Sequence, residues 1–256
     1  LTLANHLQVP FVQEVISVAT ALKEIAPKTD VAIELGGEDA KIIYFEGGNV
    51  EQRMNGICAG GTGSFIDQMA SLLQTDATGL NEYAKDYRSL YTIAARCGVF
   101  AKSDIQPLLN QGARREDVAA GILHAVVNQT VAGLAQGREI KGKLLYLGGP
   151  LTFLPALRKS FDEGLQTTGL CPENSLYFVA LGCTLANVGQ VVSPRELREK
   201  LALRAKTAAY RHQPPLFASK ADYEAFSARH QRNSEGIETL SEPNGPMYLG
   251  IDAGST

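Results

Sequence analysis

The sequence contains no tryptophan and only three methionines among its 256 residues. It has no long basic run, and its net charge of −3 gives no reason to expect a nucleic-acid partner. No uninterrupted apolar stretch approaches the ~20 residues that a membrane span needs. The first ten residues also lack the basic and apolar regions of a signal peptide. These absences favour a cytoplasmic protein without nucleic-acid or membrane partners.

Cysteine is also scarce, with Cys58, Cys97, Cys171 and Cys183 as the complete set. A disulfide framework is not expected in a chain of this length that carries no secretory signal. No CxxC pair is present, so a zinc knuckle is not expected either. The ordinary expectation for each cysteine is a buried free thiol.

What the sequence does contain is an alternation of predicted strands and helices. Hydrophobic residues make up 45% and charged residues 20%, as in an ordinary globular protein. The patterns predict a helix over 11–26, strands over 31–35, 41–45 and 50–54, a helix that starts near Gly63 with a capping box of Ser64 and Asp67, a short helix capped by Ser103, a long helix over 116–140, a strand over 143–150, a helix over 154–165, a strand over 176–179 and a helix over 181–192. Such alternation indicates an α/β domain.

The last quarter of the chain has a different character. Residues 193–247 are charged or polar and carry several prolines, which indicates a helical extension followed by a linker. The final segment, YLGIDAGST at 248–256, is an apolar strand that runs into a loop with Asp252, Gly254, Ser255 and Thr256. A strand and loop of this kind usually open a phosphate-binding domain, so these four residues are candidate nucleotide contacts.

Three glycine turns, in ELGGED, CAGGTG and YLGGP, lie at the ends of predicted strands. Glycine allows backbone N–H groups to approach an anion closely, and the N-terminus of the helix after Gly63 is expected to add positive potential. Three such turns in one α/β domain indicate a phosphate-binding cleft. Neither GxxxxGK[ST] nor GxGxxG is present, so a Walker-type loop and a dinucleotide fingerprint are both excluded.

The segments ELGGEDAKII, MNGICAGGTGSFIDQMA, RCGVFAKSDI and LYLGGP resemble those of the ATP-driven activators of 2-hydroxyacyl-CoA dehydratases. The ATPase subunits of benzoyl-CoA reductase are similar. The resemblance covers about residues 10–192. It implies the ribonuclease H-like lobe of actin, sugar kinases and Hsp70 ATPases, a mixed sheet flanked by helices, with 31–192 as the second lobe.

The same resemblance implies a domain organisation. Residues 1–30 would be the helix leading in from a missing first lobe, and 248–256 would open a following module of a larger tandem protein. An alternative is that 248–256 folds back beside 1–30 as the missing first strand. A lone second lobe carries only half of the loops that bind phosphate. The chain by itself is therefore expected to be weakly active or inactive as an ATPase.

The resemblance also implies roles for the glycine turns in binding ATP or ADP. Gly36 and Gly37 would form the second phosphate loop. The other contacts to the nucleotide would come from Gly60, Gly61, Thr62, Gly63, Gly148 and Gly149. Family members usually carry Asp where Glu34 stands and Gln where Glu38 stands. Glu34 and Glu38 are therefore the implied catalytic positions, with Glu34 organising Mg²⁺ and water.

Cys58 and Cys97 match the family positions that ligate iron. A cubane cluster needs four thiolate ligands, and two chains related by a two-fold axis supply two each. The resemblance thus implies a [4Fe–4S] cluster that bridges a homodimer and delivers electrons to a dehydratase or reductase component. Zinc captured in place of iron, an empty site, and a mononuclear site of all four cysteines remain alternatives. Cys171 and Cys183 are expected to pack as small side chains.

Two other classes of function stay open at this point. One is a kinase-like ATPase of the same fold that has no cluster. The other is a non-catalytic scaffold lobe that dimerises or docks a partner.

Overall fold

The computed structural model describes residues 2–55, 60–94, 98–186, 191–202 and 214–231. The chain divides into two units, residues 1–202 and 203–256. In the second unit the structure describes helix α11 (Lys220–Gln231), where the rings of Tyr223 and Phe226 both contact Phe217. All of the described candidate site residues lie in the first unit.

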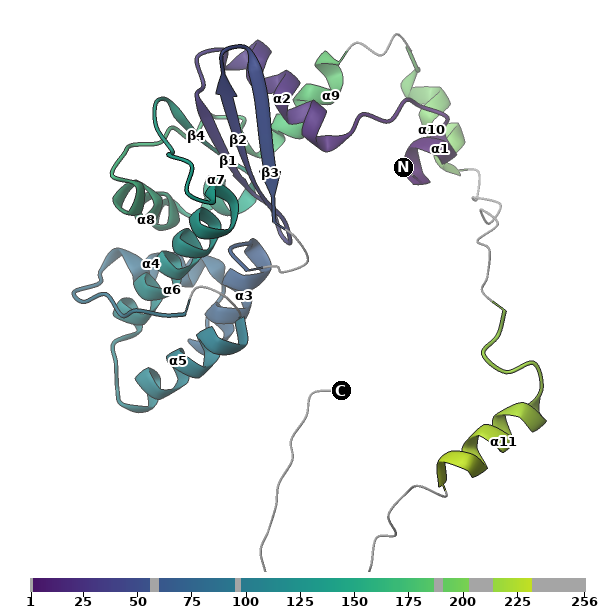
Figure 1. The fold of residues 1–256 in the computed structure, drawn as a ribbon. Helices are drawn as coiled ribbons and strands as arrows, with labels where there is room; N and C mark the ends of the chain where they lie inside the picture. Colours follow the sequence, from purple (N-terminus) through teal and green to yellow (C-terminus); the bar gives the residue numbers. More distant parts are fainter. Residues whose placement is uncertain (1, 56–59, 95–97, 187–190, 203–213, 232–256) are drawn as a thin grey trace, which may run out of the picture. The chain divides into compact units, whose positions relative to one another are not determined.

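A four-stranded mixed sheet organises the first unit, in the order β3-β2-β1-β4 (Figure 1). Strands β1 (Val31–Leu35), β2 (Ala40–Glu46) and β3 (Asn49–Met54) form the expected antiparallel meander. Strand β4 (Leu144–Leu147) pairs parallel with β1. The side chains of β1 and β4 are buried throughout, whereas β3 is partly exposed along its length. The predicted mixed sheet is confirmed.

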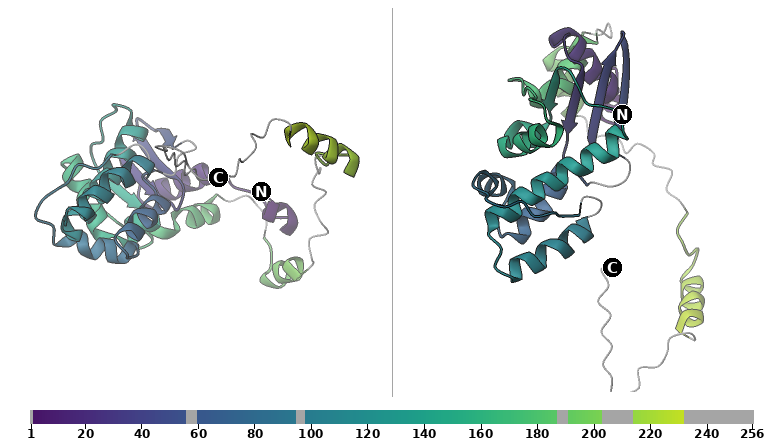
Figure 2. Two further views of the ribbon diagram at one scale, coloured as in Figure 1. Left: turned by 90° about the horizontal axis from the view of Figure 1, so that it is seen from below. Right: turned by 60° about the vertical axis from the view of Figure 1, so that its left-hand side comes forward.

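Helices cover both faces of this sheet (Figures 1 and 2). One face packs into a large core with α3 (Gly63–Leu72), α4 (Ala77–Lys85), α5 (Gly98–Asn110), α6 (Arg115–Thr130), α7 (Gly149–Phe153) and α8 (Pro155–Leu165). The other face packs into a smaller core with α2 (Glu14–Ile25) and α9 (Phe178–Leu185). Two further helices, α1 (Thr2–Leu7) and α10 (Pro194–Ala202), contact each other.

The alternation of strand residues explains the two cores. Ile33 and Leu35 of β1 point into the large core, and Ala32 between them points into the small one. Each buried Ile or Leu side chain contributes roughly 1.5–3 kcal/mol of apolar burial. A shift of one residue in the register of β1 would move Ile33 and Leu35 into the small core and Ala32 into the large one, so the pairing is strongly specified.

The longest helical run is α6 with the π-helix Val131–Ala135 that continues it. Residues Arg115–Ala135 are long and apolar enough, by length and composition, to cross a membrane. The run is not an uninterrupted apolar stretch, because it contains Arg115, Glu116, Asp117 and His124. Because 67% of the apolar window is buried inside the first unit, the run is the central helix of the large core.

Three sequence-based expectations about local structure are wrong, and one helix was missed. Residues 176–179 form no strand, because the chain at Leu170 already bridges to β4 beside Leu145 and a short 3₁₀ turn then leads into α9. Ser103 caps no helix. It lies inside α5, where its hydroxyl bonds to the carbonyl of Val99. The capping box after Gly63 is also absent, since Thr62 is the N-cap and makes no side-chain cap bond. Helix α4 was not predicted.

Candidate functional site

Two of the three glycine turns are hydrogen-bonded to each other. Strand β1 runs into a tight turn in which Gly36 N donates to Asp39 O at 2.8 Å. At the start of α3, Gly63 N donates to Gly36 O at 2.9 Å, and Ser64 N donates to Gly37 O at 2.7 Å. The first N–H groups of α3 therefore hold the turn after β1. These two N–H groups are not free to donate to a phosphate, so any effect of this helix end on an anion comes from its dipole.

The third glycine turn follows β4 and touches both of the others. Gly148 has φ +85°, and a Cβ there would overlap the backbone carbonyl of Leu35, the residue before the first turn. A Cβ on Gly63 would lie 3.3 Å from Gly36 O and 3.5 Å from Pro150 Cγ. Only glycine permits these close approaches of backbone to backbone. The structure thus brings the ends of β1, β4 and the start of α3 together.

Helix α6 supports the second turn from beneath. The Gln129 side chain occupies the space where Gly60 would carry a Cβ, and the Thr130 hydroxyl lies 2.8 Å from the corresponding position at Gly61, which has φ +79°. Thr62 between them and the start of α3 is fully buried. Thr130 itself is buried, and the helix changes to π geometry immediately after it. Such π segments often occur at functional sites.

Two of the predicted glycines face open space. No atom lies within 4 Å of the position that a Cβ would take on Gly37, and Gly37 is exposed. At Gly149, the first residue of α7, the nearest atom to such a position is Leu176 Cδ1 at 3.9 Å. The glycines of the site therefore divide into those required by packing and those with free space above them.

A cluster of charges adjoins the first turn. Lys41 is only 1% exposed and stands opposite Glu34 in the β1–β2 register, with Nζ 3.7 Å from Glu34 Oε1. Its Nζ also donates to Glu14 Oε1 at 2.6 Å and to Asp39 Oδ2. One ammonium group thus contacts carboxylates from α2, β1 and the turn.

Burial shapes the ionisation of this cluster. Burial raises the pKa of Glu34, with Lys41 opposing the shift and Glu14 and Asp39 adding to it. Burial lowers the pKa of Lys41, but the facing Glu34 carboxylate and the hydrogen bonds to Asp39 and Glu14 outweigh it and raise the pKa overall. Lys41 is therefore charged at neutral pH.

The two predicted catalytic carboxylates occupy different surroundings. Glu38 is exposed at the tip of the turn. Glu34 is buried, and among the described residues its Oε2 atom has no hydrogen-bond partner. A buried acceptor without a donor fits a ligand to a cation or an ordered water. Over the described ranges, no group of three His, Cys, Asp or Glu side chains is arranged to hold a metal. Mg²⁺ ordinarily needs only one or two carboxylates beside substrate phosphates, so Glu34 remains compatible with it.

Several predicted site residues lie outside the described residues. These are Cys58, Cys97, Asp252, Gly254, Ser255 and Thr256. The helices next to the two cysteines are described and pack together, since a Cβ on Gly98, at the start of α5, would lie 3.7–4.0 Å from Phe65, Gln68 and Met69 of α3.

The two described cysteines differ from each other. Cys171 packs against the large core with its thiol 3.3 Å from Ser175 Oγ, as expected for a small side chain. Cys183 is exposed, and its sulfur accepts a hydrogen bond from Ser17 Oγ at 3.1 Å. The expectation of a buried Cys183 is wrong, because the residue stays exposed although its sulfur contacts Ser17 of α2.

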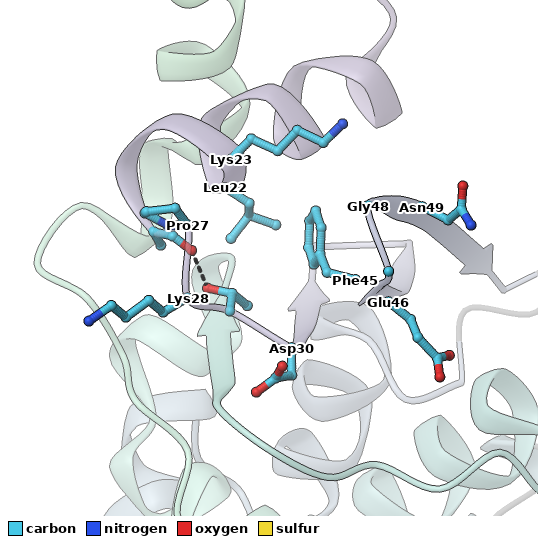
Figure 3. Close-up of a pocket in the computed structure, with 12 residues that line it drawn as sticks. Leu22, Lys23, Pro27, Lys28, Asp30, Phe45, Glu46, Gly48 and Asn49 are labelled. Carbon is cyan, nitrogen blue, oxygen red and sulfur yellow. Dashed lines mark hydrogen bonds between the residues drawn. The ribbon is translucent and has the colours of Figure 1, made fainter.

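A hollow of about 400 Å³ lies at the opposite end of β1 from the glycine turns. Figure 3 shows Leu22 and Phe45 beside it, while the charged ends of Lys23, Lys28 and Glu46 point in different directions. A ligand site needs polar groups that converge on one point. This hollow provides none, so the candidate site remains at the glycine turns.

Residues 4–182 match the BadF/BadG/BcrA/BcrD ATPase family. The chain belongs to this family. It is 33% identical over 162 residues to the (R)-2-hydroxyglutaryl-CoA dehydratase activating ATPase of Acidaminococcus fermentans, an alignment that covers 63% of this chain and 62% of that protein. The chain thus spans somewhat less than two thirds of the length of this relative.

Solved structures of the family have the same fold. The component A structure of the Acidaminococcus fermentans dehydratase superposes with a TM-score of 0.63 at 31% identity, covering 68% of this chain and 67% of that one. The Clostridium difficile activator of 2-hydroxyisocaproyl-CoA dehydratase, with bound ADPNP, gives a TM-score of 0.62 at 22% identity over 89% and 72%. The BadF/BadG/BcrA/BcrD chain described here therefore has the predicted actin-like ATPase fold.

The sequence did not reveal the supporting residues of the site. Glu14, Gln129 and Thr130 carry no motif, and their approach to the turns depends on how α2 and α6 pack. No sequence motif assigned a role to Lys41. Its place opposite Glu34 follows from the β1–β2 register, in which the four residues 36–39 connect Leu35 to its partner Ala40.

Proposed function

We propose that the chain is part of an ATP-hydrolysing activator that supplies low-potential electrons to a CoA-ester dehydratase or reductase. The observation that carries this proposal is the meeting of the three glycine turns at one end of the sheet, in a chain of this ATPase family. Because the chain spans less than two thirds of its relative, we expect weak ATPase activity or none from the chain alone.

The proposed nucleotide site is the open side of these turns. The free space above Gly37 and the ordinary spacing at Gly149 leave room for phosphates and a ribose or base. Gly36, Gly60, Gly61, Gly63 and Gly148 then hold the turns in place, with Thr62 buried beneath the start of α3. The homologous Clostridium difficile activator holds ADPNP, which supports a nucleotide as the ligand.

The proposed catalytic groups are Glu34 and Glu38. Glu34 would orient Mg²⁺ or its water through the unpartnered Oε2 atom, and Mg²⁺ when bound would neutralise phosphate charge. Lys41 holds the other oxygen at 3.7 Å and so limits how the Glu34 carboxylate turns. Glu38 places a negative charge at the exposed tip of the turn, which is unfavourable beside phosphates and argues for slow hydrolysis.

The proposed cluster ligands are Cys58 and Cys97, from two chains of a homodimer. Two described features support the proposal. The helices that follow these cysteines pack together, and the first turn of α5 presents Val99 and Phe100 at 68% and 64% exposure. Adjacent exposed apolar side chains of this kind suit a covered surface such as a dimer interface. A [4Fe–4S] cluster, when bound there, would supply one-electron chemistry.

The nucleotide proposal is tested with Gly37→Ala and a matched control, Gly133→Ala. Both glycines have open space around the added Cβ, and neither has a positive φ, so both variants should fold as the wild type does. The Cβ on residue 37 occupies the space assigned to phosphate. We expect Gly37→Ala to weaken MgADP binding by roughly tenfold, about 1.4 kcal/mol, in calorimetry at millimolar nucleotide.

Gly133→Ala should bind MgADP as the wild type does. Equal affinity of all three proteins would contradict the assignment of Gly37 to the phosphate loop.

The cluster proposal is tested by measuring iron and sulfide per dimer after anaerobic preparation. We expect four of each per dimer. A dimer that holds nucleotide but no iron would favour the kinase-like ATPase. A dimer that holds neither would favour the scaffold lobe.

A further inference from the structure

The charge cluster around Lys41 connects the first glycine turn to helix α2. Glu14, its contact on α2, is the first residue of that helix. Asp39, its contact on the turn, closes the turn through Gly36 N. The two carboxylates belong to different elements, and the ammonium group of Lys41 on β2 contacts both.

Asp39 also transmits the position of Lys41 to the turn backbone. While Oδ2 receives the Lys41 ammonium group, Oδ1 lies where a Cβ of Gly36 would be, directly against the turn. Movement of the turn therefore moves the Asp39 carboxylate, and with it one of the two hydrogen bonds of the buried ammonium group.

Helix α2, which Lys41 contacts through Glu14, is in turn packed tightly against α9. Ser17 Oγ donates to Val179 O at 2.7 Å, and a Cβ on Gly182 would overlap the backbone of Ser17. The two helices cross at backbone contact, and Val18 and Leu22 of α2 share the small core with Phe178. Close-packed helices of this kind move together.

We propose that Lys41 is a positioning residue that couples the Gly36–Gly37 turn to helices α2 and α9, with Glu14 as its contact on the helix layer. The proposal rests on the proposed function, because nucleotide at the turn is the event that would be coupled. The negative charge of a ligand at Gly37 competes with the Asp39 carboxylate for the Lys41 ammonium group. This competition changes the hydrogen bond from Lys41 to Glu14.

The test is amide hydrogen exchange with and without millimolar MgADP, followed in peptides that cover β1–β2, α2 and α9. Replacement of the buried Lys41 would leave three carboxylates without a cation and could unfold the chain. Glu14 has a half-exposed side chain, so Glu14→Gln keeps the size and removes only the charge. Glu24→Gln, on an exposed position of the same helix, is the matched control.

We expect MgADP to slow exchange at the turn and to change exchange in α2 and α9 of the wild type and of Glu24→Gln. In Glu14→Gln the response of the turn should persist, while the responses of α2 and α9 fall at least twofold. A full response of α2 in Glu14→Gln, equal losses in both variants, or no response of α2 in the wild type would each overturn the coupling. Absence of any response at the wild-type turn would overturn the proposed nucleotide site itself, and the coupling with it.

Discussion

Gly148 is the glycine whose replacement should damage the fold most. Its backbone has φ +85° and ψ 167°, a conformation that is nearly restricted to glycine. A Cβ would also overlap the Leu35 carbonyl oxygen and lie 2.8 Å from Leu35 C, in the strand beside it. No flexible side chain is involved, so the clash is relieved only if β1 and the turn after β4 move apart.

The magnitude of the effect follows from these two terms. Backbone strain of this kind costs on the order of 1–3 kcal/mol. Overpacking that displaces backbone costs a further ~1–3 kcal/mol. Gly148→Ala should therefore lower the free energy of unfolding by roughly 2–6 kcal/mol, a large share of the ~5–15 kcal/mol typical of a domain.

Urea unfolding followed by circular dichroism measures this loss. With a slope near 3 kcal/mol per M, the midpoint of Gly148→Ala should fall by about 1–2 M. The adjacent Gly149→Ala is the control, because its Cβ makes an ordinary 3.9 Å contact and lies at the start of α7. Its midpoint should stay within about 0.3 M of the wild type, since the helix propensity of alanine slightly favours it. A Gly148→Ala midpoint equal to that of the wild type would refute the reasoning.

Two further predictions concern other parts of the first unit. Hydrogen bonds from the Arg88 and Ser89 amides hold the pKa of Asp117 below its usual 3.8, so its stabilising effect is complete above that pH and is lost as pH falls through the lowered value. Asp117→Asn should therefore differ most from the wild type in urea midpoint near pH 6 and least near pH 2.5, and a constant difference would contradict this. After anaerobic purification, Cys58→Ser and Cys97→Ser should lose the visible absorbance of a cluster, whereas Cys171→Ser should keep it. Equal bleaching by Cys171→Ser would show that the ligand assignment is wrong.

Local patterns in the sequence were sufficient to predict the meander, because short hairpins depend on neighbouring residues. Alternation in 31–35 and 41–45 and the glycines between them fixed the strands and their turn. The predicted strand at 176–179 failed for the opposite reason. A run of four apolar residues is compatible with a strand or with a helix. The edge of the sheet beside β4 is also already occupied by Leu170.

The site, like the fold, could be predicted where it depends on neighbouring residues and not where it depends on packing between distant elements. Motif glycines identified the three turns, but the sequence did not indicate that the N–H groups of Gly63 and Ser64 would be used to hold the first turn. Nor did it indicate that Lys41 would gather three carboxylates, because Glu14 reaches it through the packing of α2. Contacts between elements far apart in the chain lie beyond what one sequence reveals.

The crossing of α2 and α9 makes the start of the first unit depend on a helix near its end. Val18, Ala21 and Leu22 of α2 are buried in a core that also takes Phe178 of α9, more than 150 residues later. During synthesis the meander can pair early, but this patch of α2 stays uncovered until α9 leaves the ribosome. Truncation before residue 178 would therefore leave the apolar face of α2 exposed to solvent. Such shortened chains should bind chaperones or aggregate.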